Sequence, residues 1–442
     1  CGIALLRLRK PLDFYLDKYG SALYGLDKMI LMMEKQHNRG QDGAGLAGVK
    51  LNMPPGQRYI SRYRSVENNP MQDIYNRIQR RIEELLDGQM EKIKDVDWVK
   101  NNLAFACETY LGHLRYGTFG SNSIESCHPF LRQSNWMSRN LILAGNFNMT
   151  NTSELIDELV SIGQHPKEQA DTVTVMEKIG HFLDQENDRL KSEADKNIAL
   201  NNIQRSQFLI GNIDLPRVMK KAAKAWDGGY AMGGMLGQGD SFLIRDPNGI
   251  RPAYYYFNDE IAVVASERPV IQTAFNLKFD DIKEVPPGHM IWIKRDGTVL
   301  IKKILEPKKH LACSFERIYF SRGNDGAIYN ERIELGRRLA NRVLKAANNN
   351  FDKTIFSFIP NTAEISFYGL VKGVESALNK QKINEVLELK NDFSKEQLLP
   401  ILERRPRVEK IAWKDVKLRT FIAQDLVRDD MVSHIYDSTY NI

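Results

Sequence analysis

Cys1-Gly2-Ile3 begins the sequence, and a cysteine in the first position carries a free α-amine close to its own sulfur. An α-amine has a pKa of about 7.7 to 8.0, against about 8.5 for a thiol, so it is partly neutral near pH 7 and can accept the thiol proton. Cys1 therefore predicts an N-terminal nucleophile that supplies its own general base. The alternative is a cysteine placed first by processing or cloning, and the rest of the chain must distinguish the two.

Three further segments point to one class of enzyme. A Gly-rich turn follows a helical pattern, a predicted strand ends in an Arg-Tyr pair, and an apolar run ends in an amide-rich loop. They read His37-Asn38-Arg39-Gly40-Gln41-Asp42-Gly43-Ala44-Gly45, Gly112-His113-Leu114-Arg115-Tyr116-Gly117-Thr118 and Leu141-Ile142-Leu143-Ala144-Gly145-Asn146-Phe147-Asn148. Together with Cys1, these segments resemble the class II glutamine amidotransferases.

Four later motifs narrow the resemblance. They are Arg245-Asp246-Pro247-Asn248-Gly249-Ile250-Arg251-Pro252, Ala265-Ser266-Glu267, Pro287-Gly288 and Phe315-Glu316-Arg317-Ile318-Tyr319-Phe320. Their order resembles that of the glutamine phosphoribosylpyrophosphate amidotransferases, which are also called amidophosphoribosyltransferases. The resemblance covers residues 1 to about 340 and is weaker beyond them.

Two domains are expected, both of the α/β class. For residues 1–306 the resemblance implies the αββα sandwich of N-terminal nucleophile hydrolases, and short β-like runs between residues 228 and 303 fit it. Ile74, Ile78, Ile82 and Leu85 recur at helical spacing, which predicts an inserted helix at about 71–88. Residues 307–442 then change to a helix, strand, turn and helix pattern that resembles the opening of a type I phosphoribosyltransferase-like domain.

The resemblance implies how the hydrolysis of glutamine is divided among residues. Cys1 is the nucleophile, and Asn146 with the backbone N–H of Phe147 forms the oxyanion hole. Phe147 stands where the family has glycine, and Gly145 stands where it usually has histidine. A backbone donor survives any residue except proline, but a benzyl group could reshape the glutamine pocket.

The resemblance also implies the residues that bind glutamine. Arg115 is expected to bind the α-carboxylate, because a guanidinium offers two parallel N–H groups to two oxygens. Asp171 is expected to bind the α-ammonium group. Tyr116, Thr118 and His128 lie where relatives line the pocket, although a histidine before a proline is more often structural.

The acceptor half matches the family less well. Relatives bind phosphoribosylpyrophosphate with two adjacent acids after a strand, followed by Gly-Thr, but neither Asp280-Asp281 nor Asp429-Asp430 has that setting. We therefore expect a domain that is incomplete and lacks this loop. Lys417, Arg419 and Thr420 resemble a flexible lid over the acceptor, and a solvated charged loop is the alternative.

Composition restricts the partners. The charge of +6, from 62 basic and 56 acidic residues, comes without a nucleic-acid reading motif. Four dispersed cysteines, Cys1, Cys107, Cys127 and Cys313, indicate no zinc site, disulfide framework or iron-sulfur cluster. No run approaches the ~20 apolar residues of a membrane span. We expect a cytoplasmic homo-oligomer without a membrane or nucleic-acid partner.

Three functions remain open from the sequence. In the first, glutamine is hydrolysed at Cys1 and ammonia displaces pyrophosphate from phosphoribosylpyrophosphate, with Mg2+ neutralising the leaving group, to give phosphoribosylamine for purine synthesis. In the second, only the glutaminase is active and the acceptor domain is degenerate or different. In the third, a paralogue senses glutamine or a nucleotide without turnover, which Phe147 favours and Cys1 opposes.

Overall fold

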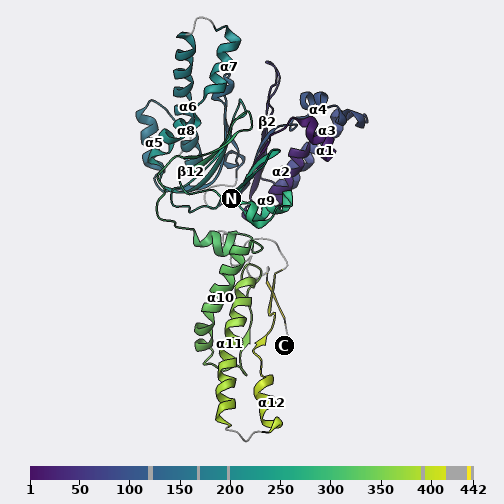
Figure 1. Cartoon of the computed structure of the whole chain (residues 1–442), viewed down its shortest axis with the longest axis vertical. Coiled ribbons are helices and arrows are strands. Elements are labelled where there is room, and N and C mark those ends of the chain that lie inside the picture. Colours follow the sequence, from purple (N-terminus) through teal and green to yellow (C-terminus); the bar gives the residue numbers. More distant parts are fainter. Residues whose placement is uncertain (118–122, 167–169, 197–199, 390–393, 415–435, 440–442) are drawn as a thin grey trace. The chain divides into compact units, whose positions relative to one another are not determined.

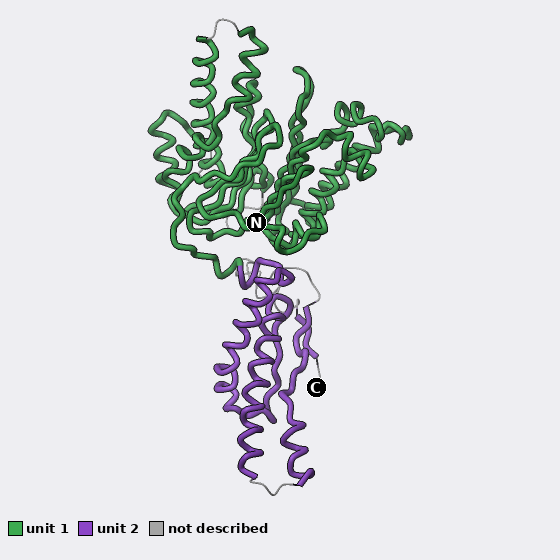
Figure 2. Tube along the Cα trace, viewed as in Figure 1, with its two compact units in different colours: residues 1–316 green, residues 317–442 purple. Residues whose placement is uncertain are grey.

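The computed structural model describes residues 1–117, 123–166, 170–196, 200–389, 394–414 and 436–439. It divides into two compact units, Cys1–Glu316 and Arg317–Ile442 (Figure 2). The sequence predicted a boundary at residue 306. The following ten residues group with the first unit because their backbone is tied to the turn after residue 245: the N–H groups of Lys308 and Leu311 donate to the carbonyls of Pro247 and Asn248, each at 2.8 Å.

Two antiparallel sheets form the centre of the first unit. Their strand orders are β11-β9-β10-β1-β4-β2-β3 and β13-β12-β8-β7-β6-β5. The strands of the seven-stranded sheet are β1 (Gly2–Leu8), β2 (Gly43–Val49), β3 (Ile60–Ser65), β4 (Thr109–Arg115), β9 (Tyr254–Phe257), β10 (Ile261–Ala265) and β11 (Lys283–Glu284). Those of the six-stranded sheet are β5 (Phe130–Arg132), β6 (Leu141–Met149), β7 (Gly228–Leu236), β8 (Ser241–Arg245), β12 (His289–Ile293) and β13 (Val299–Lys303).

Helices cover the outer face of each sheet (Figure 1). The helices on the seven-stranded side are α1 (Leu12–Tyr19), α2 (Tyr24–Lys35), α3 (Pro70–Leu86), α4 (Val96–Asn102) and α9 (Arg268–Phe275). Those on the six-stranded side are α5 (Thr152–Ser161), α6 (Asp171–Lys196), α7 (Asn202–Asn212) and α8 (Leu215–Ala222). The predicted αββα sandwich is therefore confirmed, and the helix expected at about 71–88 forms as α3.

Strand β1 shows why the apolar run after Cys1 becomes a central strand. Its side chains alternate between the two faces of the sheet. Ala4 and Leu6 pack into the core beneath the helices, whereas Ile3 and Leu5 pack between the two sheets. Every residue of the strand is buried, between β4 on one side and β10 on the other. Burial on both faces fixes the position of Cys1 at the start of the strand.

The second unit is built on a close helix pair. Its helices are α10 (Gly326–Ala346), α11 (Glu364–Glu388) and α12 (Lys395–Glu403), and its strands are β14 (Ile355–Phe356), β15 (Arg407–Val408), β16 (Ala412–Lys414) and β17 (Tyr436–Ser438). A Cβ added at Gly336 would lie 1.7 Å from the carbonyl oxygen of Ser366, and one at Gly369 would lie 2.0 Å from that of Ile333. Glycine at both positions is thus what lets α10 and α11 approach this closely.

Candidate active site

Cys1 lies where the central strand of the seven-stranded sheet begins. Gly2 is paired with Leu114 on β4, which places Cys1 beside the Arg115-Tyr116 end of that strand. The backbone N–H of Tyr116 donates to the Cys1 sulfur at 3.5 Å, and the Cys1 thiol reaches the Tyr116 carbonyl at 3.9 Å. These two contacts hold the Cys1 sulfur against the backbone of Tyr116, the residue that follows β4.

A buried ion network surrounds the backbone of Cys1. Arg39, which follows α2 in the short helix His37–Arg39, donates from Nε to the Cys1 carbonyl at 3.1 Å. Its other nitrogens pair with Glu267, at 3.1 Å, and with Glu316. The Arg39 side chain is only 1% exposed, and both carboxylates are buried. The network therefore ties the first residue to three segments that are distant in sequence.

Glu316 connects this network to Asn146. Its Oε1 accepts from the Asn146 side-chain amide at 3.0 Å and from Arg251 Nη1 at 3.0 Å. Burial alone would raise the pKa of Glu316, but Arg39, Arg251, the N-terminal ammonium and the Asn146 hydrogen bond together lower it to about 2. The carboxylate therefore stays ionised. Because one amide hydrogen of Asn146 is used by Glu316, the second is left for another acceptor.

Asn146 and Phe147 lie on opposite faces of β6. Ile142 and Ala144 point between the sheets, whereas Leu143 points toward the helices. Side chains alternate along a strand, so Asn146 lies on the same face as Ile142 and Ala144. Phe147 packs against the core on the helix side. A Cβ added at Gly145 would lie only 2.2 Å from Phe147 Cδ1. The two departures from the family pattern are therefore coupled, because the Phe147 ring occupies the space that a side chain at position 145 would need.

His128 and His113 form a stacked pair behind Gly145, with ring centroids 4.3 Å apart. His128 Nδ1 accepts from the Gly145 N–H at 3.1 Å, so its Nε2 carries the proton and donates to the Thr172 hydroxyl at 3.1 Å. His113 Nε2 donates to the Gly145 carbonyl at 3.1 Å. Burial, then Arg115, lowers the pKa of His128 to about 3. His128 is therefore neutral, both of its ring nitrogens are hydrogen-bonded, and its bond to the Gly145 N–H holds the backbone that precedes Asn146.

The predicted glutamine-binding residues are only partly brought together. Arg115 is buried at the end of β4, and its charge is close enough to His128 to lower that residue's pKa. Asp171 is the first residue of α6 and accepts from the Thr172 hydroxyl at 3.4 Å. Burial raises its pKa, and the nearby backbone N–H groups of Thr172 and Met149 oppose that rise. Met149 is the last residue of β6, which places Asp171 at the end of the strand that carries Asn146.

Some predicted residues fall outside the described ranges, and some contributing residues were missed. Thr118 and the expected lid residues Lys417, Arg419 and Thr420 lie outside the described residues. Arg39 and Glu316 both lie within quoted motifs, but the sequence assigned neither of them a role. An ion pair between residues 277 positions apart leaves no local pattern. The usable signal was a charged residue inside each matched motif.

The described residues form no metal site, no disulfide and no membrane-spanning helix. Within them, no group of three or more His, Cys, Asp or Glu side chains could hold a metal ion. None of the four cysteines, all of which are described, forms a disulfide. In the same ranges, no helix is long and apolar enough to cross a membrane.

No protein-family model matches the chain. The amidophosphoribosyltransferase of Pasteurella multocida is 26% identical over 262 residues, covering 57% of this chain and 47% of the relative. That of Schizosaccharomyces pombe is 26% identical over 387 residues, covering 81% of this chain and 59% of the relative. The chain thus spans about half the length of the curated relatives it matches.

The structural comparison agrees with the sequence comparison. The glutamine phosphoribosylpyrophosphate amidotransferase of B. subtilis, solved with ADP and GMP, matches with a TM-score of 0.58 and 20% identity, over 99% of this chain and 72% of that one. At this identity the match shows the fold. The resemblance found in the motifs is therefore confirmed: the chain is similar in sequence to amidophosphoribosyltransferases and shares the fold of their solved structures.

Proposed function

We propose that the first unit hydrolyses glutamine at Cys1 and that the ammonia is transferred to phosphoribosylpyrophosphate, as in the amidophosphoribosyltransferases that the chain resembles. The Cys1 sulfur attacks the side-chain carbonyl carbon of glutamine, and its proton passes to the α-amine. The C–N bond then breaks, ammonia leaves with that proton, and water hydrolyses the γ-glutamyl thioester to glutamate. Asn146 is proposed to donate to the oxyanion, with the backbone N–H of Phe147 as second donor.

One observation carries this proposal. Cys1 precedes β1 of one sheet and Asn146 lies on β6 of the other, yet both are tied to the same buried network through Arg39 and Glu316. Such a network costs desolvation of several charges and is therefore weak evidence for stability alone. It joins the backbone carbonyl of Cys1 to the side-chain amide of Asn146, which supports a catalytic reason for keeping it.

The second unit, Arg317–Ile442, is proposed to hold the acceptor, and Arg115, Tyr116, Thr118, His128 and Asp171 are proposed to line the glutamine pocket. Magnesium is proposed to enter as a complex with the pyrophosphate of the substrate, because Mg2+ is usually bound through substrate phosphates with few protein ligands.

Ammonia release from glutamine tests the glutaminase, and phosphoribosylamine formation tests the transfer. We expect both activities in the unmodified protein, and neither in Cys1→Ser, which keeps its fold but loses the nucleophile. Ammonia release without consumption of phosphoribosylpyrophosphate would replace the transferase by a glutaminase. Glutamine binding without hydrolysis by the unmodified protein would replace both by a glutamine sensor.

A further inference from the structure

A cavity of the first unit, about 840 Å3 in volume, lies outside the Cys1 site. It is bounded by β3, β5, the first turns of α6 and residues 164–166 after α5. Cys1, Arg115 and Asn146 are not among the residues that line it. Its volume falls within the range of about 300 to 1,000 Å3 that is typical of small-molecule sites.

Two arginines of β3 line this cavity side by side. Arg62 and Arg64 are alternate residues of one strand, so their side chains leave the same face of the sheet. Arg62 Nη1 donates to the Pro129 carbonyl at 3.2 Å, and Arg64 Nη1 donates to the Cys127 carbonyl at 2.9 Å. These carbonyls hold the two guanidiniums in place. A carbonyl is neutral, so it does not compensate the positive charge, and each one uses only one of the five N–H donors of its guanidinium.

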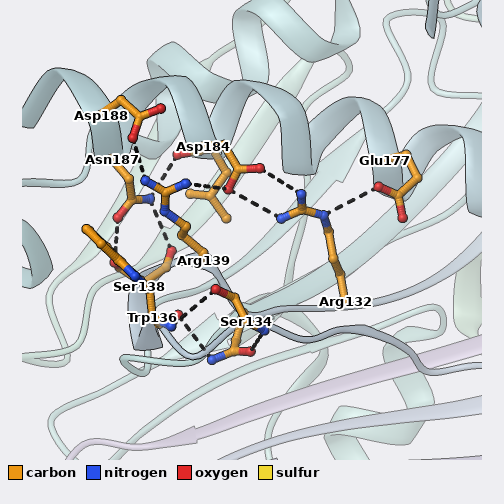
Figure 3. Close-up of polar contacts among 11 residues, drawn as sticks. Arg132, Ser134, Trp136, Ser138, Arg139, Glu177, Asp184, Asn187 and Asp188 are labelled. Atoms are coloured by element: carbon orange, nitrogen blue, oxygen red, sulfur yellow. Dashed lines mark hydrogen bonds and ion pairs between the residues drawn. The ribbon is translucent and has the colours of Figure 1, made fainter. Parts of the chain in front are cut away.

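A third arginine of the same cavity, Arg132, has its charge compensated by carboxylates, unlike Arg62 and Arg64. Arg132 donates from Nη2 to Asp184 at 2.7 Å and from Nε to Glu177 at 3.4 Å, so acidic groups on α6 neutralise it (Figure 3). No described carboxylate lies within ion-pair distance of Arg62 or Arg64. Burial, then the charge of Arg64, lowers the pKa of Arg62. Glu125 also lines the cavity, but at an exposed position. Two like charges are thus held close together without a counter-ion from the described protein.

We propose that this cavity binds a phosphorylated small molecule, with the phosphate on Arg62 and Arg64 and the organic part against Phe130 and Met176. A phosphate monoester carries nearly two negative charges at pH 7 and so matches two guanidiniums better than a single carboxylate does. Phe130, Val173 and Met176 give the cavity an apolar wall. Inorganic phosphate has no group that could pack against this wall, whereas a phosphate ester with an apolar part does. The residues that line this cavity have no role in the proposed glutaminase, and a link between the two sites is the contact of Phe130 with His128, whose ring centroids are 5.0 Å apart.

Calorimetric titration of the full chain tests the site with three probes. Phenyl phosphate carries both the phosphate and an apolar ring, inorganic phosphate lacks the ring, and benzoate replaces the phosphate by a carboxylate. We expect phenyl phosphate to bind more tightly than either of the others. Equal affinity of inorganic phosphate would overturn the assignment of the apolar wall, and equal affinity of benzoate would overturn the preference for phosphate.

Substitutions locate the binding. Arg62→Gln and Arg64→Gln should each weaken phenyl phosphate binding roughly 10- to 100-fold, the range expected for losing one hydrogen bond between charged groups. Arg64→Lys should give an intermediate loss, because it keeps the charge but not the planar fork. Arg58→Gln is the matched control, since Arg58 donates to the Ile60 carbonyl at 3.1 Å but does not line the cavity.

Three outcomes would overturn the proposal. The first is a loss in Arg58→Gln as large as the loss in Arg64→Gln, and the second is unchanged binding in both cavity variants. The third is displacement of phenyl phosphate by glutamine, which would place the phosphate in the Cys1 site. Thermal unfolding of each variant shows whether it is folded. If Arg62→Gln or Arg64→Gln does not fold, the comparison of Arg64→Lys with the unmodified protein still tests the proposal.

Discussion

Glu316→Gln tests the buried network, because it removes one charge and little volume. The glutamine can still accept a hydrogen bond from Asn146, but Arg39 and Arg251 lose a carboxylate that both of them contact. Arg39 keeps Glu267 as its partner. The variant therefore separates the effect of the charge from that of packing.

The pKa of Glu316 gives the magnitude of the effect. It falls from an ordinary value of 4.5 to about 2, which at about 1.4 kcal/mol per pH unit corresponds to about 3 kcal/mol. Removing one partner from a buried pair costs about 3 to 5 kcal/mol in general. Because Arg39 retains Glu267, we expect the lower end, a loss of about 3 kcal/mol in the free energy of unfolding at pH 7.

The pH dependence identifies the cause of this loss. A carboxylate whose pKa is lowered by folding contributes stability above its unfolded pKa and loses it as the pH falls through its folded pKa. The difference between the unmodified protein and Glu316→Gln should therefore be full above about pH 4.5 and should disappear toward pH 2. Urea unfolding at a series of pH values measures it.

A matched control keeps this test specific. Glu284 pairs with Arg245, but its side chain is 44% exposed, so Glu284→Gln should cost less than about 1 kcal/mol. A difference for Glu316→Gln that does not change between pH 7 and pH 3 would refute the electrostatic explanation. Glutamine hydrolysis provides a second measurement: kcat should fall, with a smaller change in KM, because Glu316 acts through Asn146.

The sandwich was expected from the family resemblance, and local patterns agreed with it. The helical spacing before the turn at residue 37 and the short strands after residue 228 each depend on neighbours in sequence. The domain boundary was placed earlier than residue 316, because the segment from 307 to 313 has no regular structure and its hydrogen bonds reach back to Pro247 and Asn248. Long-range hydrogen bonds of this kind leave no periodic signal.

The candidate site was predicted in its single residues but not in its connections. Cys1, Asn146 and Arg115 stand in motifs, whereas the network of Arg39 and Glu316 exists only once the sheets are stacked. Phe147 was expected to threaten the glutamine pocket. The alternation along β6 places the ring on the helix side, with its centroid 5.9 Å from that of His128. The effect of Phe147 on the glutamine pocket stays a prediction.

Three further tests of the site use four substitutions. Arg115→Lys should raise the KM for glutamine roughly 10- to 100-fold, because a point charge replaces a bidentate fork, and an unchanged KM would make Arg115 structural. Asn146→Ala should lower kcat about 10²- to 10³-fold with a smaller effect on KM, and the reverse pattern would assign Asn146 to ground-state binding. The pair at positions 145 and 147 tests coupled packing. Gly145→Ala alone should destabilise the protein by about 1 to 3 kcal/mol, because the new Cβ would meet Phe147 Cδ1 at 2.2 Å. Adding Phe147→Ala removes that clash, so the double variant should be more stable than the two single losses predict, by about 1 kcal/mol or more in a double-mutant cycle measured by urea unfolding. Additive losses would show that the Phe147 ring does not occupy the space above Gly145, and the paired departure from the family pattern would then need another cause.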